Sequence, residues 1–162
     1  METQKATLYA MTGCIGAGKT TFAKKLSNEK NAVVFLIDES IRRLGFPIKS
    51  VEDYDRFYHG VINIIADSAI QLLQLNQPVV LDFGGNIGQL DWLSSIAEKA
   101  AANIEIFHLI TPLEVRRDRV RKRNLLPNEF RFSDEEFDSM PKVSAAPPQR
   151  AGLKITVIET AT

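Results

Sequence analysis

The chain has 162 residues, of which 44% are hydrophobic and 25% are charged, and its formal net charge is zero. This composition is ordinary for a globular domain, and we expect residues 1–162 to form a single one. A zero net charge gives no overall attraction to nucleic acid or to an anionic membrane, so a nucleic-acid partner is disfavoured. One cysteine, no signal peptide and no apolar run of membrane-spanning length favour a cytoplasmic protein.

Apolar runs of strand length alternate along the chain with longer segments of helical period. Strands are predicted over residues 7–12, 32–37, 79–83, 104–110 and 153–158. Helices are predicted over residues 20–30, 51–75, 89–101 and 112–124. Because strand and helix alternate, we expect an α/β fold of three layers, with a five-stranded parallel sheet and helices on both faces.

Two segments carry further expectations. The run over residues 32–37 is almost continuously apolar, which is typical of a parallel strand buried on both faces. The stretch over residues 125–152 contains several prolines and should be irregular, apart from a short helix near residues 133–140. Ser133 can cap that helix, and Glu136 would complete a capping box.

The run from Gly13 to Thr20 matches the pattern G-x-x-x-x-G-K-[ST] without exception. In such a P-loop the glycines let consecutive backbone N–H groups converge on phosphate oxygens, the lysine adds charge near the β- and γ-phosphates, and the threonine can ligate Mg²⁺. A predicted strand precedes the run and a predicted helix follows it, as this chemistry requires. We therefore expect ATP and Mg²⁺ to bind here, through Gly13, Cys14, Ile15, Gly16, Ala17, Gly18, Lys19, Thr20 and Thr21.

Two aspartates close predicted strands, Asp38 the second and Asp82 the third. Because ligands in open α/β sheets lie beyond the carboxyl ends of the strands, both carboxylates should face the phosphates. We assign Asp82, with Thr20, to the nucleotide's Mg²⁺ and Asp38 to the acceptor hydroxyl, whose proton it would take. Either aspartate could instead cap the next helix, and the sequence leaves open whether Asp38, Glu39 or Asp82 takes the proton of the acceptor.

The predicted helix over residues 112–124 carries Arg116, Arg119 and Arg123 on one face, at i, i+3 and i+7 spacing. Three guanidiniums on one stripe suit a lid, over about residues 112–150, that closes over the phosphates and stabilises charge on the transferred group. Arg119 is also assigned to nucleotide binding. A solvated basic face and a nucleic-acid contact are the alternatives, and the P-loop earlier in the chain favours the lid.

With these residues in place, the chain resembles the small P-loop kinase-like ATPases often described as AAA-domain ATP-binding proteins. Relatives of that group include chloramphenicol phosphotransferase, gluconate kinase, the kinase domain of polynucleotide kinase and zeta toxins. The resemblance covers nearly the whole chain. It rests on the P-loop, on Asp38 followed by Arg42, on the strand over residues 79–82 continuing into Phe83-Gly84, on the arginine stretch ending at Asn124, and on residues 132–138 with Pro147-Pro148 after them.

The resemblance implies a nucleoside-kinase-like sheet, with Asp38 as the aspartate that activates the acceptor. It implies that Lys19 and Thr20 hold phosphate and Mg²⁺, and that Arg116, Arg119 and Arg123 serve as lid arginines.

The sequence thus predicts a kinase that transfers the γ-phosphoryl group of ATP to a hydroxyl of a small molecule, with Asp38, Lys19, Arg116, Arg119 and Arg123 as its catalytic residues. The alternative is an ATPase or nucleotide-dependent switch that acts on a partner. A kinase for 5′-hydroxyl nucleic acid is a third hypothesis, which the neutral net charge disfavours. The acceptor is not specified by the sequence.

Overall fold

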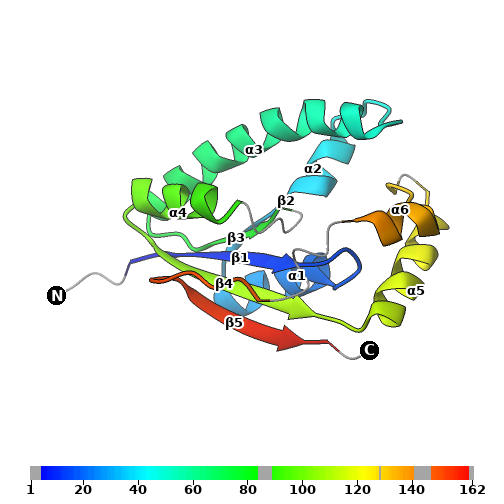
Figure 1. Cartoon of the computed structure of the whole chain (residues 1–162). Coiled ribbons are helices and arrows are strands. Elements are labelled where there is room, and N and C mark those ends of the chain that lie inside the picture. Colours follow the sequence, from blue (N-terminus) through cyan, green and yellow to red (C-terminus); the bar gives the residue numbers. More distant parts are fainter. Residues whose placement is uncertain (1–4, 84–88, 128, 141–146, 161–162) are drawn as a thin grey trace.

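The computed structural model describes residues 5–83, 89–127, 129–140 and 147–160 (Figure 1). Gly84, which follows the third predicted strand, lies outside the described residues, as do parts of the predicted lid segment. Within the described residues, no helix is long and apolar enough to cross a membrane.

Five parallel strands form one sheet in the order β2-β3-β1-β4-β5. Their bounds are β1 Thr7–Gly13, β2 Val33–Leu36, β3 Val79–Asp82, β4 Asn103–Ile110 and β5 Lys154–Glu159. The five-stranded parallel sheet is therefore confirmed. Because β1 lies in the middle, the loop that leaves its carboxyl end is flanked by the ends of β3 and β4.

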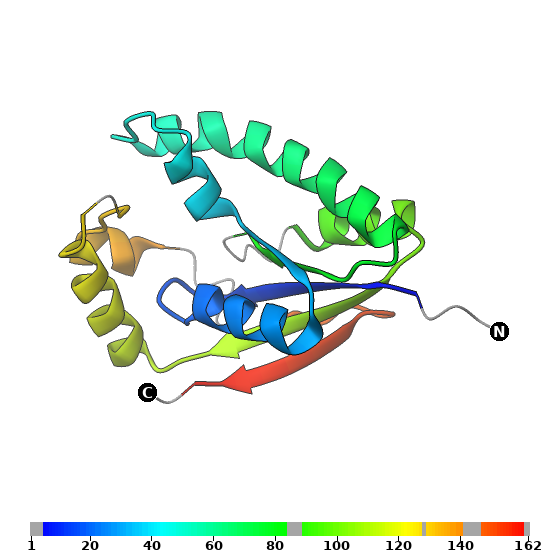
Figure 2. The same cartoon turned by 180° about the vertical axis from the view of Figure 1, so that it is seen from behind.

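Helices cover both faces of this sheet, as Figures 1 and 2 show. Their bounds are α1 Lys19–Lys30, α2 Ile37–Arg43, α3 Val51–Gln74, α4 Leu90–Lys99, α5 Leu113–Asn124 and α6 Asp134–Ser139. Helices α3 and α4 lie over one face and α1 over the other, while α5 and α6 lie beyond the carboxyl ends of the strands.

The alternation of side chains along β1 connects the sheet to both helical layers. Leu8 and Ala10 belong to the core beneath α3 and α4, whereas Tyr9 and Met11 belong to the core beneath α1. Successive residues of a strand point to opposite faces, so the apolar residues of this one strand supply both cores. Burial on both faces fixes the position of β1 and of the loop that follows it.

The prediction for the second strand was wrong in two respects. Strand β2 lies at the edge of the sheet, and Val33 is 36% exposed, so the strand is not buried on both faces. The chain also leaves the strand earlier than predicted, because α2 begins at Ile37. Ile37 and Ile41, one helical turn apart, are both fully buried in the core, and this i, i+4 pair is what makes the segment a helix.

Asp38 consequently does not close a strand but lies in the first turn of α2. The positive end of the helix dipole favours acidic residues there, and Arg42 and Arg43 occupy the last turn, which favours cations. The capping box of the short helix α6 is confirmed, since Ser133 and Glu136 each bond the other's backbone N–H.

Two adjacent isoleucines of α3 provide a matched test of this packing. Ile65 is 5% exposed and belongs to the core, whereas Ile64 is 69% exposed. Ile65→Ala should lower the free energy of unfolding by about 2–5 kcal/mol, because it removes buried methyl groups and leaves a cavity. Ile64→Ala should change it by no more than about 0.5 kcal/mol. Urea denaturation measures both, and equal effects would contradict this placement of α3.

Candidate active site

The loop between β1 and α1 has a backbone that only glycine adopts readily. Gly13, Gly16 and Gly18 have φ values of 140°, 77° and 93°, in the region that side chains rarely enter. A Cβ at Gly16 would lie 2.7 Å from the carbonyl oxygen of Arg116, so glycine also permits close contact with the α5 backbone. The loop is therefore held between its own strand and the arginine-bearing helix.

The side chain of Lys19 folds back over this loop. Its Nζ donates hydrogen bonds to the carbonyl oxygens of Gly13 and Cys14, both at 3.0 Å. Burial lowers the pKa of Lys19 below its ordinary value, and the nearby carboxylates of Asp82 and Asp38 oppose this shift. The lysine is thus a partly buried cation for which an added anion would be a favourable partner.

Thr20 and Asp82 form the site at which a cation could be held. The Thr20 Oγ1 donates to Asp82 Oδ2 at 2.5 Å, and the Asp82 side chain is mostly buried at the end of β3. A hydroxyl and a carboxylate oxygen at this separation are hard ligands of the type that Mg²⁺ prefers. Among the residues described, no group of three or more His, Cys, Asp or Glu side chains could bind a metal without other ligands. The donor set therefore fits Mg²⁺ that brings phosphate oxygens and water with it.

The acidic residues of α2 have different partners. Asp38 Oδ1 accepts a hydrogen bond of 2.6 Å from the Tyr54 hydroxyl on α3. Glu39 instead pairs with Arg43 at 2.6 Å and lies 3.8 Å from Lys24. Asp38 is also one of the carboxylates that oppose the lowered pKa of Lys19.

Three arginines of α5 lie toward the P-loop. Arg116 donates to the Ile15 carbonyl at 3.4 Å, and Arg119 donates to the Gly16 carbonyl at 3.2 Å. The positive charge of Arg123 acts on Lys19, and its Nε is buried without a hydrogen-bond partner among the described residues. Arg116 and Arg119 of the predicted stripe therefore contact the loop directly.

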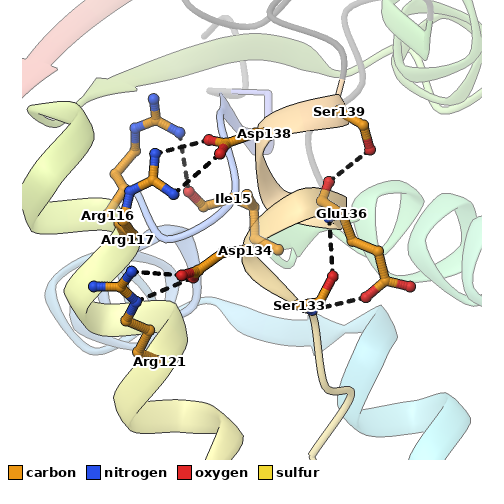
Figure 3. Close-up of polar contacts among 9 residues, drawn as sticks. All are labelled: Ile15, Arg116, Arg117, Arg121, Ser133, Asp134, Glu136, Asp138 and Ser139. Carbon is orange, nitrogen blue, oxygen red and sulfur yellow. Dashed lines mark hydrogen bonds and ion pairs between the residues drawn. The ribbon is translucent and has the colours of Figure 1, made fainter.

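The other arginines of α5, Arg117 and Arg121, pair with carboxylates of α6 (Figure 3). Arg117 makes two hydrogen bonds to the carboxylate of Asp138 on α6, at 2.7 and 3.3 Å. Arg121 makes a second two-pronged pair with Asp134, at 2.5 and 3.0 Å. Both pairs fasten α6 to α5, and Arg116, which reaches the P-loop, also lies over the Phe137 ring of α6.

The remaining residues assigned from the sequence lie in or beside the loop. Cys14 and Ile15 are half-buried, Ala17 is fully buried, and Thr21 is exposed in the first turn of α1. The carbonyl of Ala17 accepts hydrogen bonds from Thr111 at 3.1 Å and from Thr160 at 3.3 Å. These two threonines, which no motif indicated, fix the back of the loop to the ends of β4 and β5.

Sequence reasoning also missed the surroundings of Asp38. Tyr58, one turn beyond Tyr54 on α3, donates to the Phe83 carbonyl at 3.2 Å and accepts from Gln89 at 2.5 Å. Phe130 meets the Tyr54 ring edge-on. The i, i+4 spacing of the two tyrosines was the available signal, but apolar residues at this spacing more often belong to a core.

The parallel sheet, the P-loop at the end of β1 and the arginine-bearing helix define a P-loop NTPase of kinase-like architecture. A sequence model of the AAA domain matches residues 8–147 of this chain. The chain therefore belongs to the AAA domain family. No curated protein matches the sequence significantly.

Solved structures are similar in fold. A Chloroflexus aurantiacus protein to which kinase activity is attributed has 19% identity and a TM-score of 0.78, over 98% of this chain and 90% of that one. Kti12 from Chaetomium thermophilum, bound to ADP-AlF3, has 17% identity and a TM-score of 0.66, over 93% and 88% of the two chains. A sugar kinase from Janibacter sp. has 17% identity and a TM-score of 0.57, over 96% and 85%. At these identities the likeness concerns the fold.

The contact of the loop with α5 can be tested at Gly16. Gly16→Ala should lower the free energy of unfolding by about 2 kcal/mol or more, because the residue is left-handed and the added Cβ meets backbone atoms of Arg116. Gly60 in α3 is the control, since nothing outside its own helix lies within 4 Å of an added Cβ. Gly60→Ala should stabilise the protein by about 0.5–1 kcal/mol. Urea denaturation compares the two variants, and a neutral Gly16→Ala would refute the close contact.

Proposed function

We propose that this protein is a kinase that binds ATP with Mg²⁺ and transfers the γ-phosphoryl group to a hydroxyl of a small molecule. The observation that carries the proposal is the convergence of Lys19, the Thr20–Asp82 pair and Asp38, which follow the carboxyl ends of β1, β3 and β2. A phosphate donor, a cation and an acceptor activated by a carboxylate would each have a partner there.

The P-loop would bind the phosphates. Its backbone N–H groups and the start of α1 favour an anion, and Lys19 would exchange its two carbonyl contacts for phosphate oxygens. Thr20, with Asp82 beside it, would hold Mg²⁺, which neutralises charge on the β- and γ-phosphates when bound. Cys14, Ile15, Ala17 and Thr21 would contribute as parts of the loop and of the first helical turn.

Asp38 would activate the acceptor. Its carboxylate takes the proton of the acceptor hydroxyl while the hydroxyl oxygen forms a bond to the γ-phosphorus. The bond from that phosphorus to the bridging oxygen of the β-phosphate breaks, and ADP leaves with the electron pair. Tyr54 donates to one oxygen of Asp38 and so keeps the carboxylate in position. Glu39 does not fit this role, because Arg43 and Lys24 hold it.

Arg116, Arg119 and Arg123 would act as the lid arginines. Two of them now donate only to backbone carbonyls, and the third has a buried Nε without a hydrogen-bond partner in the described part of the chain. Guanidinium groups bind phosphoryl oxygens more strongly than carbonyls, because both partners are then charged. Their role would be to stabilise the charge on the phosphoryl group during transfer.

The proposed base has a matched control in the next residue. Asp38→Asn should lower the turnover with an accepted substrate by about 10²–10⁴-fold, because proton removal is lost, and should leave ATP affinity within about twofold. Glu39→Gln should keep near-normal turnover, since that carboxylate faces surface cations. Lys19→Ala should abolish nucleotide binding. The measurements are calorimetric ATP binding and coupled ADP release, and full transfer by Asp38→Asn would refute the assignment of the base.

The activity itself can be tested by screening sugars, nucleosides and antibiotics for stimulated release of ADP. A kinase should respond to a subset of hydroxyl compounds, with release well above the basal rate. Release that stays basal throughout would favour the nucleotide-dependent switch instead.

A further inference from the structure

Two tyrosines of α3, together with Phe130, form a group of aromatic side chains to which the proposed phosphoryl transfer assigns no chemical step. The rings of Tyr54 and Tyr58 stack with their centroids 5.6 Å apart, and Phe130 meets Tyr54 edge-on at 5.2 Å. We call these three residues the aromatic cluster. All three are half-buried, so each keeps part of its ring surface accessible.

The aromatic cluster is joined directly to the proposed base, because the Tyr54 hydroxyl donates to Asp38. Asp38 in turn lies close enough to Lys19 to act on its charge. A hydroxyl bound by Asp38 would therefore lie beside Tyr54, which bonds the same carboxylate. The substituents of the molecule that carries this hydroxyl would lie against the cluster.

Gln89 provides a polar group at the edge of the cluster. Its Nε2 donates to the Tyr58 hydroxyl at 2.5 Å. Its Oε1 is buried and has no hydrogen-bond partner among the described residues. A buried acceptor without a donor is costly, and a site with such a group favours ligands that supply an O–H or N–H.

The charges around the cluster disfavour an anionic ligand. The carboxylates of Asp38 and Asp55 both act on the two tyrosines and, together with burial, raise the pKa of each phenol. The guanidinium of Arg42 lies over the Phe130 ring at 5.7 Å, but it is already paired with Glu129 at 3.3 Å. An anion at the aromatic cluster would be repelled by Asp38 and Asp55, and it would have to compete with Glu129 for Arg42.

We propose that the aromatic cluster and Gln89 form the binding site of the acceptor, and that the acceptor is an uncharged, hydroxylated ring compound. The inference rests on the proposed kinase function and narrows its substrate class. Aromatic walls with few polar groups are typical of sites for such molecules. The same charges would disfavour polyanionic nucleic acid and sugar acids.

The test uses matched pairs of compounds that share a ring and differ in charge. These are nucleosides with their 3′-monophosphates, and hexoses with the corresponding hexonic acids. Calorimetry measures their binding to the protein with Mg²⁺ and a non-hydrolysable ATP analogue. A neutral compound should bind at least about tenfold more tightly than its anionic partner. Tighter binding of the anionic members, or no binding by any neutral one, would overturn the inference.

Arg42 allows a sharper comparison. Glu129→Gln should release the guanidinium and shift the ratio of anionic to neutral affinity by about tenfold toward the anions. Glu135→Gln removes the same charge from an exposed position on α6 and should leave the ratio unchanged. An unchanged ratio in Glu129→Gln would contradict the role given to the Arg42–Glu129 pair.

Transfer is measured separately as ADP formed from ATP with each compound. A neutral compound that binds more tightly than its anionic partner without stimulating ADP formation would support the inference and contradict the proposed kinase function. An anionic compound that binds preferentially and is phosphorylated would contradict the inference and support the proposed kinase function.

Discussion

The collection of positive charge at the carboxyl end of β1 is the constraint on which the rest of the site depends. Lys19 lies partly buried against the loop, and α5 brings Arg116 and Arg119 onto the loop carbonyls. Backbone carbonyls and two nearby carboxylates offset this charge only in part, which is why burial still lowers the pKa of the lysine. A triphosphate would satisfy these cations together, because each would gain a charged partner.

The order of the strands places the other groups around this charge. Because β1 is flanked by β3 and β4, the end of β3 brings Asp82 beside Thr20. The edge strand β2 leads into α2, so Asp38 approaches from the far side of β3, where the long helix α3 supplies Tyr54. The groups proposed to bind a donor and an acceptor thus lie together beyond the carboxyl ends of the strands, as transfer between two bound molecules requires.

Features set by local sequence could be predicted, whereas several that depend on distant contacts could not. The P-loop, Asp82 at the end of its strand and the capping box at Ser133 depend on residues close together in the chain. The helix at Asp38 was missed because its apolar start continues the preceding strand, and only burial of Ile37 and Ile41 decides between the two. The hydrogen bond from Tyr54 to Asp38 joins residues 16 apart on different helices, which no local pattern records.

The most direct test of the central claim is a structure of the protein with ADP, Mg²⁺ and aluminium fluoride, which mimics the phosphoryl group in transfer. The proposed function predicts that Arg116 and Arg119 leave the Ile15 and Gly16 carbonyls and contact the fluoride or the phosphates. It also predicts that Asp38 lies within hydrogen-bond distance of the oxygen in line with the fluoride. Arginines that stay on the loop carbonyls, with Asp38 remote from the ligand, would contradict it.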